Sequence, residues 1–188
     1  MMNATCLKFR AKTDADTAFV TIRNNDTGCY GGYGYTGDKV VVNLASDCYG
    51  DTSTLIHEMM HVLGFDHEQT RYDRDMYLEV QWENIQAGQE HNFQKYPRTK
   101  AYPRYPYDLS SVMQYFLTAF GVGGRPTMIL TDSSIDENSV GNANSMSRSD
   151  ILRMRSAYKC DFNGESGGIG RLDYKFEESK FAKNNFFF

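Results

Sequence analysis

The chain has 188 residues, of which 40% are apolar, and a formal net charge of −4. This length is sufficient for one domain with a hydrophobic core. The small negative charge and the lack of a long basic run argue against a nucleic-acid partner or a charged membrane surface, and no apolar stretch approaches the length of a transmembrane helix.

The first quarter of the chain is predicted to form short strands. Residues 6–12 and 19–23 combine β-branched and aromatic side chains between polar, turn-like segments, and residues 39–45 (KVVVNLA) give the strongest strand pattern. Residues 29–35 are rich in glycine. They indicate a bulged strand or tight loop, because neither the lysine nor the helix start of a phosphate-binding loop follows.

Residues 57–75 (HEMMHVLGFDHEQTRYDRD) contain three of the four histidines. On an α-helix, His57 and His61 lie on one face about 6 Å apart along the axis, so both can bind one metal ion. Gly64 stands where this helix should end, because glycine readily takes the left-handed conformation needed there. The chain can then bring His67 in as a third ligand. Three imidazoles leave zinc an open position for water, as in catalytic sites.

The same predicted helix carries Glu58, rotated by roughly 100° from His57. This rotation is too large for Glu58 to join the histidines as a ligand, but it suits a carboxylate that holds a water on the metal. Residues 51–53 (Asp-Thr-Ser) are candidate N-terminal caps of the helix. A bare His-Glu-x-x-His also occurs by chance on ordinary amphipathic helices, but the added Gly64 and His67 favour a metal site.

The four cysteines, at positions 6, 29, 48 and 160, are widely and irregularly spaced. This spacing fits two disulfides better than a second zinc site, which usually shows short Cys-x-x-Cys pairs, and all three pairings remain open. Four reduced thiols in a cytosolic protein are the alternative. Sequons at Asn3 and Asn25 agree with secretion. No signal peptide is visible, so we expect an extracellular protein whose chain is incomplete at its start.

The second half of the chain is predicted to be rich in loops. Residues 97–106 contain three prolines and residues 121–149 are rich in Gly, Ser and Asn, which indicates irregular structure. Residues 149–158 predict a helix capped by Ser149. Residues 161–188 begin with a glycine-rich linker composition and are expected to form a disordered tail. Strands followed by a metal-binding helix indicate an α+β layout, with the helix lying on a sheet.

Two sequence motifs carry a family resemblance. The pattern HExxHxxGFxHExxRxDRD at residues 57–75, followed by Ser-x-Met-x-Tyr at residues 111–115, resembles the astacin family of zinc metalloendopeptidases within the metzincins. The similarity runs from about residue 5 to residue 160. It implies a metzincin-like α+β domain over residues 1–160 with a mixed sheet, an active-site helix and a loop-rich C-terminal subdomain, followed by the tail of residues 161–188.

The resemblance also implies roles for individual residues. One Zn²⁺ ion would be bound by His57, His61 and His67. Glu58 would be the catalytic general base, and Tyr115 would be the tyrosine that ligates zinc at rest and swings away to stabilise the transition state. The family also implies a methionine turn at Met113 and the disulfides Cys6–Cys160 and Cys29–Cys48.

The resemblance begins after the first strand and the long helix that backs the sheet in the family, so we expect an N-terminally truncated catalytic domain. The family counterpart of Glu68 interacts with a buried mature N-terminus that this chain lacks, so we expect a water-bridged Glu68. Arg71, Asp73 and Arg74 are expected to form a structural ion-pair cluster rather than catalytic groups.

We therefore expect a secreted zinc-dependent endopeptidase that hydrolyses protein or peptide substrates. The alternative is a truncated, inactive zinc- or peptide-binding domain, which the missing N-terminal residues favour and the intact Glu58 and Tyr115 oppose. A structural zinc module is a weaker alternative, because structural sites usually fill all four zinc positions with protein ligands.

Overall fold

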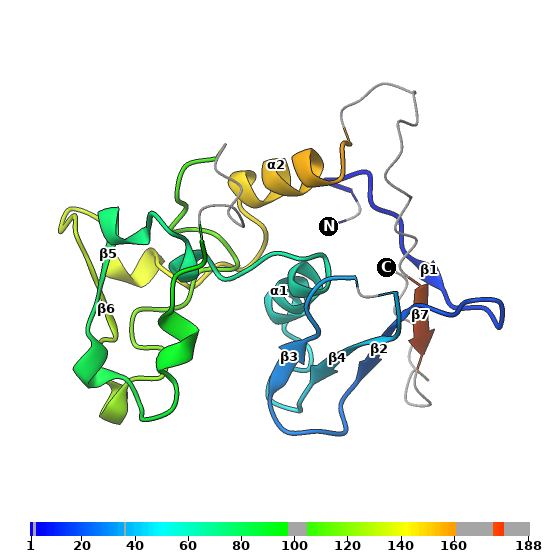
Figure 1. The fold of residues 1–188 in the computed structure, drawn as a ribbon, viewed down its shortest axis with the longest axis horizontal. Coiled ribbons are helices and arrows are strands. Elements are labelled where there is room, and N and C mark those ends of the chain that lie inside the picture. The colour runs from blue at the N-terminus through cyan, green and yellow to red at the C-terminus, as the bar shows by residue number, and fades with distance from the viewer. Residues whose placement is uncertain (2, 36, 98–104, 161–174, 179–188) are drawn as a thin grey trace. The chain divides into compact units, whose positions relative to one another are not determined.

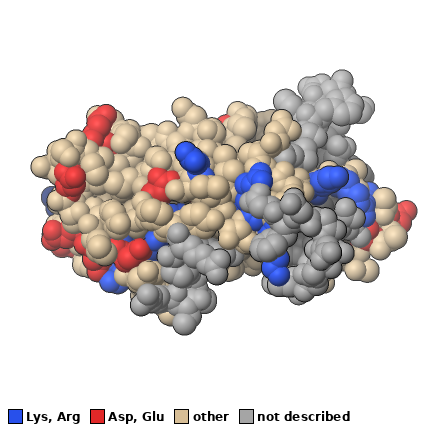
Figure 2. Space-filling model, turned by 90° about the horizontal axis from the view of Figure 1, so that it is seen from above, with Lys and Arg blue, Asp and Glu red and all other residues tan. Residues whose placement is uncertain are grey.

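The computed structural model describes residues 1, 3–35, 37–97, 105–160 and 175–178, the last four by their backbone (Figure 1). The chain divides into two compact units, Met1–Phe65 with Met154–Phe188, and Asp66–Arg153. Figure 2 shows both basic (Lys, Arg) and acidic (Asp, Glu) side chains on the surface of the molecule. None of the helices in the described ranges is long and apolar enough to cross a membrane.

The first unit contains a mixed sheet, as the family resemblance implies. Its strand order is β1-β7-β2-β4-β3, with β3 at one edge and antiparallel to β4, whereas the other pairs are parallel (Figure 1). The strands are β1 (Arg10–Ala11), β2 (Val20–Arg23), β3 (Cys29–Gly31), β4 (Val40–Leu44) and β7 (Lys175–Glu178).

One strand prediction and part of the tail prediction need correction. The strand expected over residues 6–12 is confined to Arg10–Ala11, because only these residues pair with β7. Strand β7 lies within the predicted disordered tail, yet Lys175–Glu178 pairs with both β1 and β2. Residues 161–174 and 179–188 of that tail lie outside the described residues, so the division of the chain at residue 160 remains a prediction.

Helix α1 (Thr52–Val62) has a defined cap at each end. At its start, the carboxylate of Asp51 accepts the backbone N–H of Ser53 at 2.9 Å, which satisfies a donor that has no partner within the helix. At its end, Gly64 takes a φ of 86°. The N–H of Gly64 donates to the carbonyl of His61 at 2.8 Å and that of Phe65 to the carbonyl of Met60 at 3.0 Å. This pair of bonds is a Schellman motif, which reverses the chain direction.

Helix α1 packs against β3 and β4 and encloses the core of the first unit. The parallel register places Val20 opposite Val40 and Ile22 opposite Val42. Fully burying one such aliphatic side chain stabilises a fold by about 1.5–3 kcal/mol, so this layer fixes the helix on the sheet. Its buried apolar members include Val20, Val40, Val42, Leu44, Met59, Met60 and Val62.

The second unit is rich in loops, as predicted. Its antiparallel strands β5 (Leu78–Val80) and β6 (Met128–Leu130) pair Leu78 with Leu130. These strands join a core that also contains Ile85, Phe93, Tyr107 and Val140. Short 3-10 turns connect the segments at Glu68–Thr70, Arg74–Met76, Trp82–Asn84, Glu90–Phe93, Val122–Gly124 and Glu137–Ser139.

Helix α2 (Arg148–Ala157) confirms the helix predicted at residues 149–158, but its cap is Ser147 rather than Ser149. The Ser147 hydroxyl accepts the N–H of Asp150 at 2.9 Å, and the Asp150 carboxylate accepts the N–H of Ser147 at 3.0 Å. This reciprocal arrangement is a capping box. The sequence prediction placed the cap too late in the chain because Ser147 and Ser149 are both acceptable cap residues.

Two disulfides lie in the first unit. They join Cys6 to Cys160 and Cys29 to Cys48, with Cα–Cα distances of 5.2 and 6.4 Å. The pairing implied by the family resemblance is thereby confirmed. The second disulfide links the edge strand β3 to the segment that leads into α1.

We predict that Asp51→Ala lowers the free energy of unfolding by about 1 kcal/mol, because the first turn of α1 loses its cap. Asp51→Asn should retain most of the stability, since an asparagine oxygen accepts the same bond. Urea denaturation measures both effects. Asp14→Ala, at an exposed position away from any helix, is the control; an equal loss in that variant would contradict a capping role for Asp51.

Candidate active site

The structure brings the three predicted histidine ligands together. Their donor nitrogens all lie within 4.8 Å of one another, and the Nε2 atoms of His57 and His61 are 3.1 Å apart. Zinc–nitrogen bonds of about 2.0–2.1 Å in a tetrahedral site place the donor atoms about 3.3 Å apart. The set therefore fits a zinc ion, with α1 supplying two ligands and the chain reversal at Gly64 supplying His67.

The environment of His61 holds its ring in a metal-binding state. Its Nδ1 atom lies 2.8 Å from the carbonyl oxygen of Phe65, so Nδ1–H donates and Nε2 is left with a lone pair for the metal. Burial, together with the charge of neighbouring His57, lowers the pKa of His61 to about 4. The ring is consequently neutral at neutral pH, as coordination requires.

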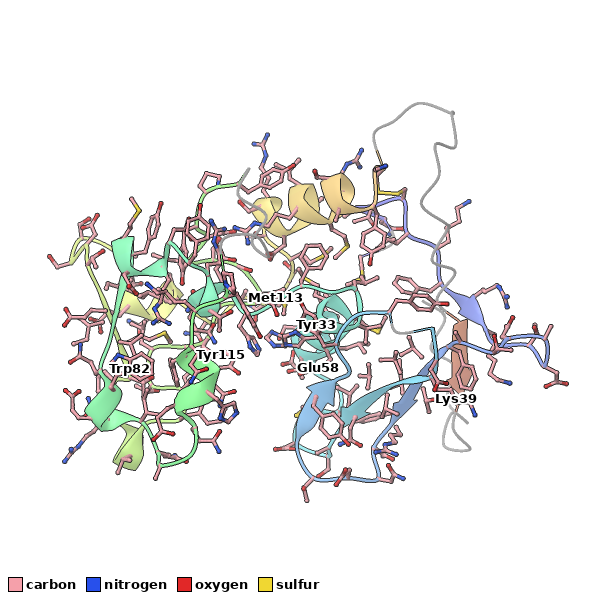
Figure 3. The ribbon with its side chains drawn as sticks, in the orientation of Figure 1. Tyr33, Lys39, Glu58, Trp82, Met113 and Tyr115 are labelled. Carbon is pink, nitrogen blue, oxygen red and sulfur yellow. A yellow bond between two sulfur atoms is a disulfide. The ribbon has the colours of Figure 1, made fainter. Side chains whose placement is uncertain are left out.

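Glu58 lies on α1 between the two helical ligands and is only 6% exposed (Figure 3). Burial raises the pKa of its carboxyl group to about 7, while a hydrogen bond from the backbone N–H of Gly31 acts in the opposite direction. Gly31 belongs to the edge strand β3. A Cβ atom at this glycine would lie 2.5 Å from the backbone oxygen of Glu58, so glycine permits the close approach of strand and helix.

Met113 and Tyr115 lie in the second unit, close in sequence to each other (Figure 3). Met113 is 2% exposed, and its carbonyl accepts the N–H of Glu68, the residue after His67, at 2.9 Å. The ring of Tyr115 lies 4.3 Å from that of His67, between centroids. The predicted methionine and tyrosine therefore both contact the segment that carries the third ligand, Met113 by a backbone hydrogen bond and Tyr115 by its ring.

Gln69 is a site residue that the sequence analysis missed. It is fully buried, and its side-chain oxygen accepts the backbone N–H of Tyr115 at 3.3 Å. The rings of Phe93 and Phe120 lie 6.3 and 5.7 Å from that of Tyr115. The backbone and ring of the tyrosine are therefore both supported. No local sequence signal predicts the hydrogen bond between Tyr115 and Gln69, because these two residues are 46 positions apart.

The expectation of a water-bridged Glu68 is wrong. This side chain is buried, and its Oε1 atom accepts hydrogen bonds from Arg153 at 2.7 Å, Arg71 at 3.1 Å and the backbone of Asp108 at 2.8 Å. Its Oε2 atom accepts a bond from Arg153 at 2.5 Å. The positive charges of Arg71 and Arg153 therefore compensate the negative charge of the Glu68 carboxylate.

The predicted ion-pair cluster is present in the second unit. Arg71 donates two hydrogen bonds to the Asp73 carboxylate, at 2.9 and 2.8 Å. Arg74 pairs with Asp75 and also donates to the backbone carbonyls of Gln69 and Phe93. These bonds fix the segment that follows the zinc ligands, which supports the structural role assigned to the cluster.

Comparisons with known proteins agree with this geometry. The family model Astacin, which describes a family of peptidases, matches residues 1–159. The zinc metalloproteinase nas-15 of Caenorhabditis elegans is 37% identical over 162 residues, which are 86% of this chain and 28% of that protein. The astacin-like metalloendopeptidase of Mus musculus is 42% identical over 158 residues, which are 83% of this chain and 35% of that protein.

The chain thus spans about a third of the length of these curated relatives. Among solved structures, it is similar to high choriolytic enzyme 1, a hatching enzyme zinc-protease from Oryzias latipes, with a TM-score of 0.77 and 34% identity. That match covers 85% of this chain and 77% of the other. The chain belongs to the astacin family of zinc metalloendopeptidases, and His57, His61 and His67 are its zinc ligands.

Proposed function

We propose that this chain is the catalytic domain of a secreted zinc endopeptidase, with Glu58 as general base and Tyr115 as stabiliser of the transition state. The observation that carries the proposal is the position of Glu58, a buried carboxylate that lies between two zinc ligands in the sequence of one helix, and burial raises its pKa to about 7 in the metal-free chain. A general base acts best when its pKa lies near the working pH.

The side chain of Glu58 moves a proton in this proposal. When bound, zinc lowers the pKa of a water molecule and polarises the peptide carbonyl. Glu58 accepts a proton as the water oxygen attacks the carbonyl carbon, and then donates that proton to the nitrogen as the carbon–nitrogen bond breaks. The N–H of Gly31 restrains the carboxylate through this cycle.

Tyr115 supplies a hydroxyl donor beside the metal site. Its ring is close to that of the ligand His67, and Gln69 holds its backbone. A phenol at this position can donate to the oxygen that gains negative charge in the transition state, a type of contact worth several kcal/mol in hydrolases. We assign this role to Tyr115 by its place beside His67 and by the family motif.

We also propose an extracellular location. Both disulfides are of the kind that forms and persists in oxidising compartments. The two sequon asparagines, Asn3 and Asn25, are exposed and accessible to glycosylation. The substrates are proteins or peptides.

We predict that Glu58→Ala reduces the cleavage of a quenched fluorescent peptide library about 100-fold or more, because the proton acceptor is lost. Zinc content should stay near one per chain, since the three histidines remain. Glu83→Ala, at an exposed position, should cleave normally. An unaltered chain that binds one zinc without cleaving any peptide would instead support the inactive zinc-binding alternative.

Tyr115→Phe should reduce kcat about 10- to 100-fold and leave KM within about 3-fold, because the lost hydroxyl acts in the transition state rather than on bound substrate. Steady-state kinetics on one cleaved peptide separate these parameters. Tyr49→Phe, where the ring is 63% exposed, is the matched control. A change in KM alone would assign Tyr115 to substrate binding.

Glu58→Gln should stabilise the metal-free protein at alkaline pH. The carboxyl group has a pKa of 4.5 as a free group and about 7 in the fold, so the stability of the unaltered protein falls as the pH rises from 4.5 to 7 and remains lower above that range. The glutamine variant avoids this loss, which amounts to about 3 kcal/mol at pH 8 and little at pH 4.5.

Urea denaturation in the presence of a chelator measures this difference. Glu83→Gln should show no such pH dependence, because its carboxylate is exposed. A stability difference between Glu58→Gln and the unaltered chain that does not change from pH 4.5 to pH 8 would contradict a raised pKa at Glu58.

A further inference from the structure

We propose that Arg153 of α2 is a positioning residue for the zinc site, because its two-point ion pair with the buried Glu68 fixes the segment that carries the ligand His67. The expected effect of Arg153 on turnover rests on the proposed function. The expected effect of Arg153 on metal binding does not depend on catalysis.

The ion pair between Arg153 and Glu68 is buried and bidentate. The Nη1 and Nη2 atoms of Arg153 lie 2.5 and 2.7 Å from the two carboxylate oxygens, and the side chains are only 7% and 3% exposed. A planar guanidinium that donates in parallel to both oxygens fixes the orientation of a carboxylate, which the single-point ammonium of lysine does not do. Nη2 also donates to the carbonyl of Pro106 at 2.7 Å.

The contribution of Arg153 differs from that of Arg71. Arg71 donates to Oε1 of Glu68 and divides its other donors between Asp73 and backbone carbonyls. Within the described part of the chain, Oε2 of Glu68 receives its hydrogen bond from Arg153. Loss of Arg153 would remove the donor to Oε2 and weaken the charge compensation of a buried carboxylate, which is costly in a protein interior.

Glu68 transmits this restraint directly to the metal site. It follows His67 in the chain, and its backbone N–H donates to the carbonyl of Met113 at 2.9 Å. Thus one residue bonds Arg153 through its side chain and the methionine turn through its backbone. A shift of Glu68 would move both the third ligand and the turn.

Helix α2 supports the same turn from a second position. Asp150, one helical turn before Arg153, is fully buried and accepts the Ser111 hydroxyl at 2.6 Å and the N–H of Val112 at 3.0 Å. Residues three apart share a face of a helix. The same face of α2 therefore holds the segment after His67 through Arg153 and the segment before Met113 through Asp150.

The test compares Arg153→Lys and Arg153→Gln with the unaltered full chain, with Co²⁺ in place of zinc. The visible absorption of bound Co²⁺ reports ligand geometry, and competition with a chelator reports metal affinity. We expect both variants to change the cobalt spectrum and to weaken metal binding by about 10-fold, the size of effect typical of groups that orient metal ligands. For zinc-loaded protein, kcat should fall about 10-fold with KM nearly unchanged.

Arg148→Gln is the matched control, because it removes the same charge from an exposed position on the same helix. This variant should keep the cobalt spectrum, the metal affinity and kcat. If Arg153→Gln does not fold, Glu68→Gln/Arg153→Gln replaces it, since two amides avoid an unpaired buried charge. The double variant should fold and still show the altered spectrum.

Variants of Arg153 that unfold at lower temperature but keep the cobalt spectrum, metal affinity and kcat per metal-loaded molecule would overturn the proposal and leave Arg153 a purely structural residue. Cobalt spectra and affinities can be read even if the unaltered chain cleaves no peptide. Failure of the proposed function is therefore distinguishable from failure of this inference.

Discussion

Three imidazole nitrogens must reach the coordination sphere of one ion, and much of this structure serves that requirement. The helical repeat brings His57 and His61 together without further help. The third ligand depends on a reversal of the chain, which Gly64 permits through its positive φ and the two hydrogen bonds of the Schellman motif. Helix α1 carries two ligands and ends just before the third. The cap at Asp51 and the packing of α1 on β3 and β4 therefore help to position the metal ligands, because they stabilise this helix.

The same helix keeps the proposed general base away from water. Burial makes ionisation of Glu58 costly and raises its pKa to about 7, while the N–H of Gly31 offsets part of that cost. A group held in this way is a poor contributor to the stability of the metal-free fold and a good proton acceptor near neutral pH. The edge strand β3 therefore has a chemical role as well as a structural one, because its backbone directs a donor at the carboxylate.

The second unit supports His67 with buried charge rather than with a large sheet. Burying a carboxylate is expensive unless its oxygens are paired and hydrogen-bonded. At Glu68 both conditions are met by Arg71, Arg153 and the N–H of Asp108. In a loop-rich region, such directional bonds restrict the backbone where aliphatic packing alone would allow several arrangements. This explains why the arginines cluster beside a metal ligand.

The sequence by itself determined the features that depend on local spacing. The His-Glu-x-x-His pattern, Gly64 and His67 define the metal site, because helix geometry and a glycine reversal act over a few residues. The main strands and both helices follow from short patterns in the same way. The disulfide pairing came from the family resemblance, since spacing alone left three choices.

Only the tertiary structure decided which distant groups surround that site. Glu68 and Arg153 are 85 positions apart, and the donor to Glu58 is the backbone of Gly31. No sequence pattern predicts either contact, since any arginine could pair with Glu68 and any backbone amide could donate to Glu58. Strand β7 could not be predicted from local sequence for a related reason. Its partners β1 and β2 precede it by more than 150 positions in the sequence. Local patterns specify ligands, whereas burial and long-range pairing specify how firmly those ligands are held.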